Sequence, residues 1–364
     1  MTNLTLNNLT LSYDGDNEFA VNDLCLKIAS GELVTLLGPS GCGKTSTLKM
    51  IAGLIQPDSG DIRFDERSVL KVLPEKRKAA MVFQNHLLFP YMNVRQNIAF
   101  GLKMQRMARS DRDARVDEIM QRVHLHQLGE RKPHQISGGQ RQRAALARAL
   151  VTEPDLLLLD EPLSSLDVHL RGDMRQLILE LQRQSGTTTI MVTHDQHEAL
   201  LVSDKIALML EGSLRQYDTP ERMFDQPADE VCARFFGTKN FIHGTVEGNL
   251  LNCALGTLKL PAIANTGSKT TSQRVATFRS ENLQLNPSAD HPNRFKVLID
   301  SINFLGTHRE FGAQLMTEDN GDSSQGGDAV VLHVHCHAKE LGDYRVGDTL
   351  TIAIPPESIW ILPN

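Results

Sequence analysis

Eight consecutive residues near the start of the chain have the pattern of a phosphate-binding loop. Residues 38–45 read Gly-Pro-Ser-Gly-Cys-Gly-Lys-Thr, which matches G-x-x-x-x-G-K-[ST] between a predicted strand and a predicted helix. The glycines let backbone N–H groups close around phosphate oxygens, and the helix start adds partial positive charge. Lys44 supplies a mobile cation for the β- and γ-phosphates, and the Thr45 hydroxyl can ligate Mg²⁺. The pattern therefore predicts a nucleotide phosphate site.

A second group of candidate residues follows a run of leucines. Asp160 and Glu161 come directly after Leu156–Leu159. A carboxylate at the end of a buried strand can hold a metal ion, directly or through water, and the next carboxylate can polarise an attacking water. These two motifs predict nucleoside triphosphate and Mg²⁺ binding with hydrolysis. On their own they leave a kinase and a GTPase open.

Three short apolar runs must position these groups. Residues 32–37, 156–159 and 187–192 are too short for helices and are typical of buried strands. Helical patterns over 45–54 and 93–152 separate them. This alternation indicates an α/β domain with a largely parallel sheet, in which ligands bind at the carboxyl ends of the strands.

One helix in the second helical stretch has its own start signal. Ser110 and Asp113 have the spacing of a capping box, which predicts that Ser110 caps a helix. The apolar face of this helix falls at i, i+3, i+4 and i+7. Its members are Val116, Ile119, Met120 and Val123.

The segment Ile136-Ser137-Gly138-Gly139-Gln140 separates the remaining classes of nucleotide-binding protein. With it, the sequence resembles the ATP-binding-cassette (ABC) ATPases, whose signature lies just upstream of the acidic strand. The other motifs follow in that family's order: Tyr13, the phosphate loop, Val82-Phe83-Gln84, the signature, Asp160-Glu161, Ser164-Ser165-Leu166-Asp167 and His194. The resemblance covers residues 1–236 and implies an α/β P-loop NTPase fold with a helical subdomain at about 87–153.

The resemblance also implies a role for each matching residue. Glu161 is expected to be the catalytic base and His194 the switch histidine at the γ-phosphate. Gln84 is expected to be the glutamine that touches Mg²⁺ and links the site to the membrane partner. The expected Mg²⁺ ligands are Thr45, Gln84 and Asp160. The residues expected to contact ATP are Tyr13, which stacks on adenine, and Gly38, Pro39, Ser40, Gly41, Cys42, Gly43, Lys44, Thr45, Ser46, Asp160, Ser137, Gly138, Gly139, Gln140 and Asp167.

The signature carries an implication about assembly. Ser137 and the amides of Gly138 and Gly139 open a helix, so they form an anion site. In the family that this chain resembles, the site caps the γ-phosphate of ATP bound to the opposite subunit. A homodimer that sandwiches two nucleotides is therefore expected.

Composition excludes several other classes. Among 364 residues, Lys plus Arg number 38 and Asp plus Glu 44, which leaves a net charge of −6 and excludes a bulk nucleic-acid binder. No apolar run reaches the roughly 18 residues of a membrane span, and we expect no secretory signal. The cysteines lack the paired spacing of a disulfide framework or a zinc cage, which predicts reduced thiols. They are Cys25, Cys42, Cys232, Cys253 and Cys336.

The sequence changes character at residue 237, and we predict a separate small all-β domain over 237–364. Short strands are predicted at 295–299, 330–338, 349–354 and 359–362, and a loop rich in Gly, Ser and Asp at 317–328. This tail is similar to the regulatory (TOBE-like, OB-type) domain of importer ATPases of the maltose, polyamine, sulfate and ferric-iron systems. The matching segments are Phe304-Leu305-Gly306 and Arg279-Ser280-Glu281-Asn282.

Three histidines alternate along one predicted strand of this tail: His333, His335 and His337. Such H-x-H pairs can bind metals. Apolar residues occupy the alternate positions, so a half-buried strand with a polar outer side is the interpretation we favour over a metal site.

The resemblance as a whole implies the ATP-binding and ATP-hydrolysing subunit of an importer, with the junction at 235–241 favouring the polyamine (spermidine/putrescine) branch. Importers of ferric iron, sulfate, phosphonate or sugar are alternatives, as is an ABC switch or sensor without transport. The implied partners are a second copy, two integral-membrane permease subunits and, indirectly, an extracytoplasmic solute-binding protein, but no nucleic acid. The implied location is peripheral, at the cytoplasmic face of the inner (plasma) membrane.

The resemblance also implies where the permease binds. In this family a short helix of the permease enters a groove between Gln84 and the helical subdomain. The segment Phe89-Pro90-Tyr91-Met92 is expected to line that groove, because exposed aromatic and Met side chains suit a partner helix. Internal packing of the same side chains is the alternative.

Overall fold

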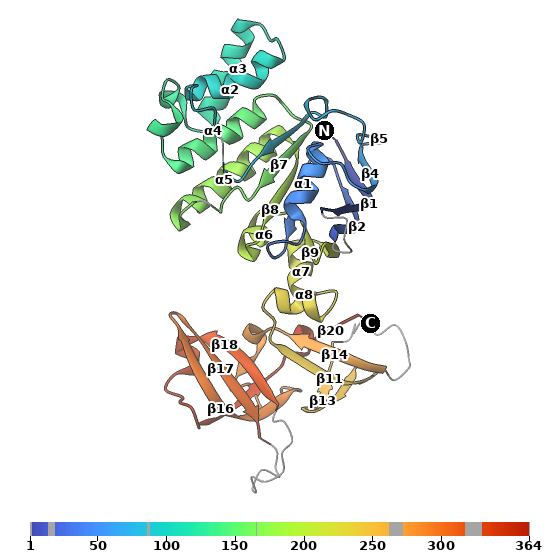
Figure 1. Ribbon diagram of the computed structural model, residues 1–364. Coiled ribbons are helices and arrows are strands. Elements are labelled where there is room, and N and C mark those ends of the chain that lie inside the picture. Colours follow the sequence, from blue (N-terminus) through green and yellow to red (C-terminus); the bar gives the residue numbers. More distant parts are fainter. Residues whose placement is uncertain are drawn as a thin grey trace. The chain divides into compact units, whose positions relative to one another are not determined.

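The computed structural model describes residues 2–13, 19–85, 88–164, 166–261, 272–316 and 330–363. Its chain forms two compact units, Met1–Met223 and Phe224–Asn364 (Figure 1). The predicted loop at 317–328 lies outside the described residues. Within the described ranges, no helix is long and apolar enough to cross a membrane.

A six-stranded sheet, ordered β10-β9-β3-β8-β7-β6, forms the centre of the first unit. All of its neighbouring strands pair in parallel except β10, which pairs antiparallel with β9. The strands are β3 (Leu33–Leu37), β6 (Ala79–Val82), β7 (Leu156–Asp160), β8 (Thr188–Thr193), β9 (Lys205–Leu210) and β10 (Ser213–Asp218). The three apolar runs singled out in the sequence are β3, β7 and β8, which confirms those predictions.

The leucine run of β7 is apolar throughout because both of its faces are buried. Leu157 and Leu159 pack into the core shared with the helical subdomain. Leu156 and Leu158 pack into the core on the other face of the sheet. Asp160 is the next residue on that second face, which also holds the helix after the phosphate loop.

That helix, α1 (Lys44–Ala52), packs with an antiparallel sheet of order β2-β1-β4-β5. The strands are β1 (Leu4–Ser12), β2 (Phe19–Ile28), β4 (Ser59–Phe64) and β5 (Arg67–Ser68). Buried Arg77 closes the end of α1: its guanidinium donates to the carbonyls of Met50, Ile51 and Val72. These bonds satisfy carbonyls that a helix end leaves without partners.

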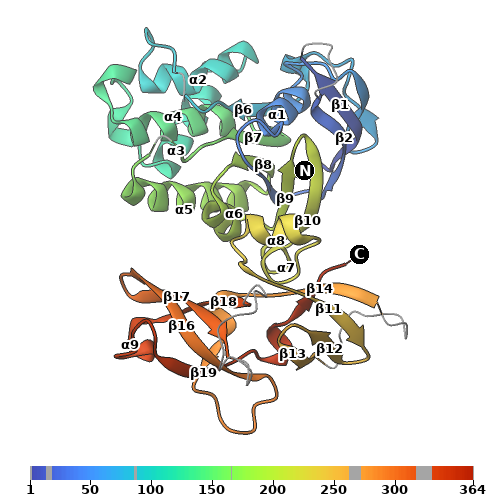
Figure 2. The same ribbon diagram turned by 60° about the horizontal axis from the view of Figure 1, so that its bottom comes forward.

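The remaining helices of the first unit fall into two groups. One group forms the helical subdomain, and the other covers the central sheet. Figures 1 and 2 show α2, α3 and α4 together, on the side of α1 away from β1 and β2. The helices are α2 (Val94–Met104), α3 (Arg109–Arg122), α4 (Gly138–Leu150), α5 (Val168–Ser185) and α6 (Gln196–Val202). A further helix, α7 (Pro220–Asp225), crosses the division between the two units. The mainly helical prediction for 93–152 is confirmed.

The predicted start of α3 was wrong. The helix begins at Arg109 after Ala108, with no side-chain cap, and Ser110 lies in the first turn, bonded to Asp111. Asp113 pairs instead with Arg109 and Arg112, so it cannot close a capping box. The predicted apolar face is buried at all four positions.

The second unit is all-β around a single core, as predicted. It contains two antiparallel sheets, β13-β12-β11-β14-β20 and β15-β19-β16-β17-β18. The strands are β11 (Asn240–Glu247), β12 (Leu250–Cys253), β13 (Gly256–Lys259), β14 (Ser272–Phe278), β15 (Gln284–Leu285), β16 (Arg294–Leu305), β17 (His308–Leu315), β18 (Val331–His337), β19 (Thr349–Ala353) and β20 (Trp360–Ile361). Two short helices accompany them, α8 (Glu230–Phe235) and α9 (Ala338–Leu341).

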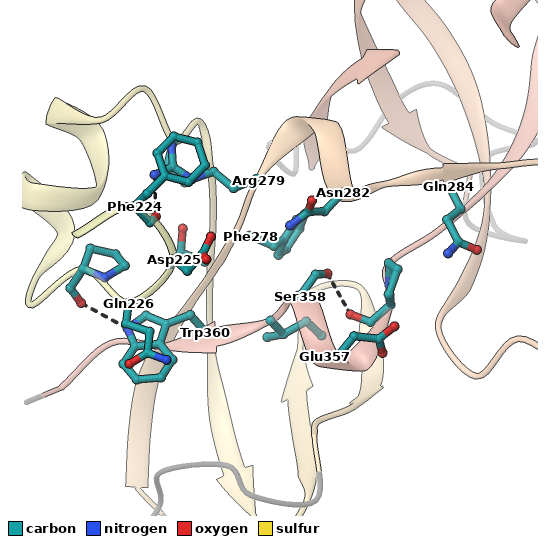
Figure 3. Close-up of a pocket in the computed structure, with 15 residues that line it drawn as sticks. Phe224, Asp225, Gln226, Phe278, Arg279, Asn282, Gln284, Glu357, Ser358 and Trp360 are labelled. Atoms are coloured by element: carbon teal, nitrogen blue, oxygen red, sulfur yellow. Dashed lines mark hydrogen bonds between the residues drawn. The ribbon is translucent and has the colours of Figure 1, made fainter. Parts of the chain in front are cut away.

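The compact units divide earlier than the predicted boundary after residue 236, because side chains of the second unit hold the segment 224–236. Buried Arg279 donates to the carbonyls of Phe224 and Phe236, and its guanidinium lies 3.6 Å from the centre of the Phe224 ring (Figure 3). Trp360 Nε1 donates to the Pro227 carbonyl at 3.0 Å. The segment therefore folds with the β domain, whereas sequence similarity alone had grouped it with the cassette.

The histidine-rich strand is β18, and its burial alternates as predicted. Leu332, Val334 and Cys336 are buried, and the three histidines between and after them are half-buried or exposed. Along the described parts of the chain, no three His, Cys, Asp or Glu side chains are arranged to hold a metal ion.

Replacing Arg77 with Met should destabilise the first unit. The change leaves buried carbonyls at the end of α1 without their donor, which costs about 2–3 kcal/mol of unfolding free energy. Urea denaturation followed by circular dichroism measures this loss as a lower midpoint. Arg63→Met, which removes a partly exposed ion pair with Asp61, is the control and should cost less than about 1 kcal/mol. Equal losses in both variants would contradict the proposed role of Arg77.

Candidate functional site

The phosphate loop connects β3 to α1 and needs glycine at its last turn. Gly43 caps α1 with φ at +91°, and a Cβ there would lie 2.1 Å from the Ala20 carbonyl oxygen. Only glycine fits that conformation and that close approach. The first amides of α1 have no partners within the helix, so they face the loop as hydrogen-bond donors for an anion.

Lys44 is buried inside this loop. Its ammonium group donates to the carbonyls of Gly38 at 2.8 Å and Pro39 at 2.7 Å, and lies 3.5 Å from Cys42 Sγ. Cys42 is buried too. The loop thus folds around its own cation, which an incoming phosphate group can attract away from the two carbonyls.

Two oxygen-bearing side chains meet at the end of β7. The Thr45 hydroxyl donates to Asp160 Oδ1 at 2.8 Å, and Asp160 is only 6% exposed. Burial raises the pKa of the Asp160 carboxyl, the charge of Glu161 raises it further, and the bond from Thr45 opposes both. A hard divalent cation suits this pair of oxygen ligands.

The carboxylate of Glu161 is held from two neighbouring strand ends. Gln84, after β6, donates from Nε2 to Glu161 Oε2 at 2.9 Å, and Nδ1 of His194, after β8, lies 3.2 Å from Oε1. The Glu161 backbone is in the left-handed region, with φ at +45°, and its N–H donates to the Val192 carbonyl. The three predicted catalytic residues therefore lie together at the carboxyl edge of the sheet.

Ser164 joins this group, and the sequence reasoning assigned it no role. Its hydroxyl donates to the Glu161 carbonyl at 3.0 Å and lies 3.5 Å from Gln84 Nε2. It fixes the turn after β7 that aims the glutamate. Its place in the Ser164-to-Asp167 motif, three residues after Glu161, is the signal that could have found it.

Tyr13, the residue predicted to stack on adenine, follows β1 and is largely exposed. Its hydroxyl lies 2.8 Å from the Ser46 hydroxyl in the first turn of α1. The aromatic ring is thus attached to the same helix start that carries Lys44 and Thr45. The residue predicted to bind adenine therefore lies beside the phosphate loop.

The signature residues, 136–140, make hydrogen bonds of their own, separate from those of the phosphate loop and the carboxyl edge of the sheet. Ser137 caps α4 by accepting from the Gln140 N–H, and the Gln140 side chain accepts from the Ser137 N–H. Asp167 caps α5 in the same way through the Leu170 N–H. Within the described residues, no hydrogen bond joins the signature to the phosphate loop of its own chain.

The second unit holds a separate cavity of about 560 Å³, shown in Figure 3. Carboxylates of Asp225 and Glu357 and the aromatic rings of Phe278 and Trp360 are among its lining groups. None of the predicted nucleotide-site residues lines it.

Comparison with known proteins gives close relatives over most of the chain. The profile of the family described as "ABC transporter" matches residues 21–164. The spermidine/putrescine import ATP-binding protein PotA of Chromobacterium violaceum is 45% identical over 296 residues, which cover 79% of this chain and 81% of that protein. The PotA of Thermobifida fusca is 39% identical over 352 residues, 95% of this chain and 89% of that protein.

A relative with another named cargo matches almost as well. The Fe(3+) ions import ATP-binding protein FbpC of Fusobacterium nucleatum is 39% identical over 314 residues, 86% of this chain and 83% of that protein. Among solved structures, a dimeric ATP-binding cassette, MJ0796, bound to ADP and Pi, matches with a TM-score of 0.55 and 30% identity. It covers 60% of this chain and 98% of its own.

Replacing Asp160 with Asn should stabilise the protein and abolish turnover. Burial raises the pKa of Asp160 in the folded state above its value in the unfolded chain. The free energy of unfolding therefore falls as the pH rises from the unfolded-state pKa through the folded-state pKa, because the charged carboxylate is less stable in the folded protein. The urea midpoint of Asp160→Asn should therefore exceed the parent's at neutral pH.

The two properties are measured side by side. ATP hydrolysis by the variant should fall at least about 100-fold if Asp160 holds the metal ion as the sequence predicts, because a metal ligand is worth several kcal/mol of transition-state stabilisation. At about pH 3, below the ordinary Asp pKa of about 3.9, the stability difference should vanish. If the variant is less stable than the parent at pH 7, burial of the charged Asp160 carboxylate does not destabilise the fold.

Proposed function

The chain belongs to the ABC transporter family of ATP-binding proteins, and on that premise we propose that it is the ATP-hydrolysing subunit of a bacterial-type polyamine importer. The observation that carries this proposal is the meeting of Gln84, Glu161 and His194 beside the phosphate loop. Relatives named for spermidine and putrescine import, which match most of the chain, support polyamines as the cargo. The ferric-iron relative makes Fe³⁺ the second candidate.

We assign nucleotide binding to the loop and its helix. The amides at the start of α1 and the Lys44 ammonium bind the β- and γ-phosphates, while the Tyr13 ring stacks on adenine. Lys44 exchanges its two internal carbonyl partners for phosphate oxygens. The exchange keeps the ammonium hydrogen-bonded in both states, so that its burial costs little when ATP leaves.

We assign the metal site to Thr45, Gln84 and Asp160. When bound with ATP, Mg²⁺ would draw charge from the γ-phosphoryl oxygens. The contact between Thr45 and Asp160 brings together two oxygen-bearing side chains that would hold the ion, and the side-chain oxygen of Gln84 would supply a third ligand.

Glu161 is proposed to activate the attacking water. Its carboxylate accepts from Gln84 and lies against His194, so both oxygens are oriented before ATP binds. Oriented in this way, it can take the proton of a water aligned with the γ-phosphate. His194 is proposed to donate a hydrogen bond to the γ-phosphoryl group.

A second copy of the chain completes the site. Ser137, Gly138 and Gly139 open α4 as an anion site, and the Ser137 bonds to Gln140 lie within that helix start. We propose that these three residues cap the γ-phosphate of ATP bound to the second copy. We propose that Asp167 also contacts that nucleotide. The dimeric cassette among the solved relatives supports this arrangement.

The proposed membrane partner is a permease that docks on the segment after Gln84. Tyr91 is 92% exposed, whereas Phe89 packs on Phe100 with ring centres 4.7 Å apart. Buried Asn97 bonds to backbone groups of Phe89 and Met92, which holds the segment rigid. A cavity of about 600 Å³ adjoins it between α2 and α3. With a permease as partner, we propose a peripheral position at the cytoplasmic face of the plasma membrane.

Glu161→Gln should trap an ATP-bound dimer. The amide keeps the shape of the side chain but cannot accept the proton of the water, so turnover should fall at least about 100-fold while ATP still closes the two copies. Size-exclusion chromatography with ATP and Mg²⁺ should show the dimer in the variant but not in the parent. Ordinary turnover in the variant would refute the assignment of the base.

Tyr91→Ala should weaken capture of the permease. Removing an exposed aromatic anchor costs at least about 1.4 kcal/mol of binding, or tenfold in affinity. The tagged chain is isolated from detergent-solubilised membranes of its own cells, and integral membrane proteins are quantified by mass spectrometry. Leu73→Ala, at another exposed apolar position, is the matched control and should capture as much permease as the parent. Recovery of the parent without any membrane protein would favour the switch or sensor alternative.

A further inference from the structure

His194 is held in place by the residues on both sides of it. Thr193 ends β8, and Asp195 caps α6 by accepting from the N–H groups of His197 and Glu198. The histidine is therefore the single residue between a buried strand end and a capped helix. Its backbone conformation depends on how firmly these two ends are connected.

A chain of two hydrogen bonds connects them across the histidine. The Asp195 N–H donates to the Thr193 hydroxyl oxygen at 3.0 Å, and that hydroxyl donates to Glu198 Oε2 at 2.7 Å. Thr193 and Glu198 are both buried, at 3% and 6% exposed. Because the hydroxyl has one proton, the glutamate acceptor fixes its direction, and the oxygen lone pairs then point to the Asp195 amide.

We infer that Glu198 is a positioning residue for ATP hydrolysis, which acts through Thr193 to hold His194 in contact with Glu161. The inference rests on the proposed role of His194. It adds to the site a residue that touches neither nucleotide nor metal. Glu198 sets the backbone on both sides of the histidine, and the histidine transmits that setting to the carboxylate of the base.

The environment of Glu198 agrees with a positioning role. Burial raises the pKa of its carboxyl, the Thr193 bond lowers it, and Asp195 raises it, while Arg171 and His194 lower it. Burying the Glu198 carboxylate costs desolvation free energy, whereas an apolar side chain at this position would pack without that cost. What a carboxylate supplies and an apolar group cannot is the acceptor for the Thr193 hydroxyl.

The test compares variants that remove the acceptor or the hydroxyl with variants that keep them. Glu198→Ala and Thr193→Val should each lower the kcat of ATP hydrolysis by about 10- to 100-fold, with KM for ATP changed less than about twofold, because a displaced catalytic group slows chemistry more than binding. Glu198→Gln and Thr193→Ser should stay within about twofold of the parent. The double variant Thr193→Val/Glu198→Ala should be no slower than the slower single variant.

Controls separate positioning from folding. Rates are normalised to protein that binds a fluorescent ATP analogue, so partly unfolded protein does not count. His197→Ala, an exposed position on the same helix, should match the parent. A parent-like kcat in Glu198→Ala, or a loss in Glu198→Gln as large as in Glu198→Ala, would overturn the inference.

His194→Ala shows which statement fails. If it turns over ATP normally, the proposed role of His194 is wrong and the inference falls with it. If it is inactive while Glu198→Ala retains the parent kcat, the proposed function stands and only the positioning role of Glu198 is rejected.

Discussion

The parallel pairing of β7 with β8 is the constraint on which the rest of the site depends. Asp160 lies opposite Val192, and the Glu161 N–H continues the contact by donating to the Val192 carbonyl. This register sets the Glu161 carboxylate beside His194. A slip by one residue would exchange the two faces of β7 and move Asp160 away from Thr45. The pairing of these two strand ends therefore fixes the positions of Asp160 and Glu161.

Several polar groups at this edge are hydrogen-bonded to other groups of the same chain. Lys44 bonds to loop carbonyls, Thr45 to Asp160, and Gln84 to Glu161. Buried polar groups need such partners, so a chain that must survive without nucleotide keeps them internal. On the proposed assignment, ATP binding exchanges these partners rather than adding bonds, so that the net gain in free energy is smaller than the number of new contacts suggests.

Sequence predicts those features that follow from local pattern. The strands β3, β7 and β8 were predictable because residues buried on both faces must be apolar, and the phosphate loop because only glycine suits its turns. The start of α3 was not, because Asp113 had ion-pair partners that the capping pattern could not reveal. The contact between Thr193 and Glu198, five residues apart across a strand–helix junction, depends on a turn geometry that no periodicity encodes.

Backbone strain and buried carboxyl groups at this site destabilise the fold, and the packing of the core offsets them. Glu161 occupies the left-handed backbone region, a strain of about 1–3 kcal/mol, and Asp160 and Glu198 carry buried carboxyl groups. Such groups persist only where the surrounding structure overdetermines them. Here the strand ends belong to a sheet packed on both faces, with each of its central strands buried along its whole length. Burial keeps Asp160 and Glu198 in fixed positions but costs desolvation, which the packing of the sheet on both faces must offset. The doubly covered parallel sheet is thus what lets this chain keep a preorganised acidic edge in the absence of its ligand.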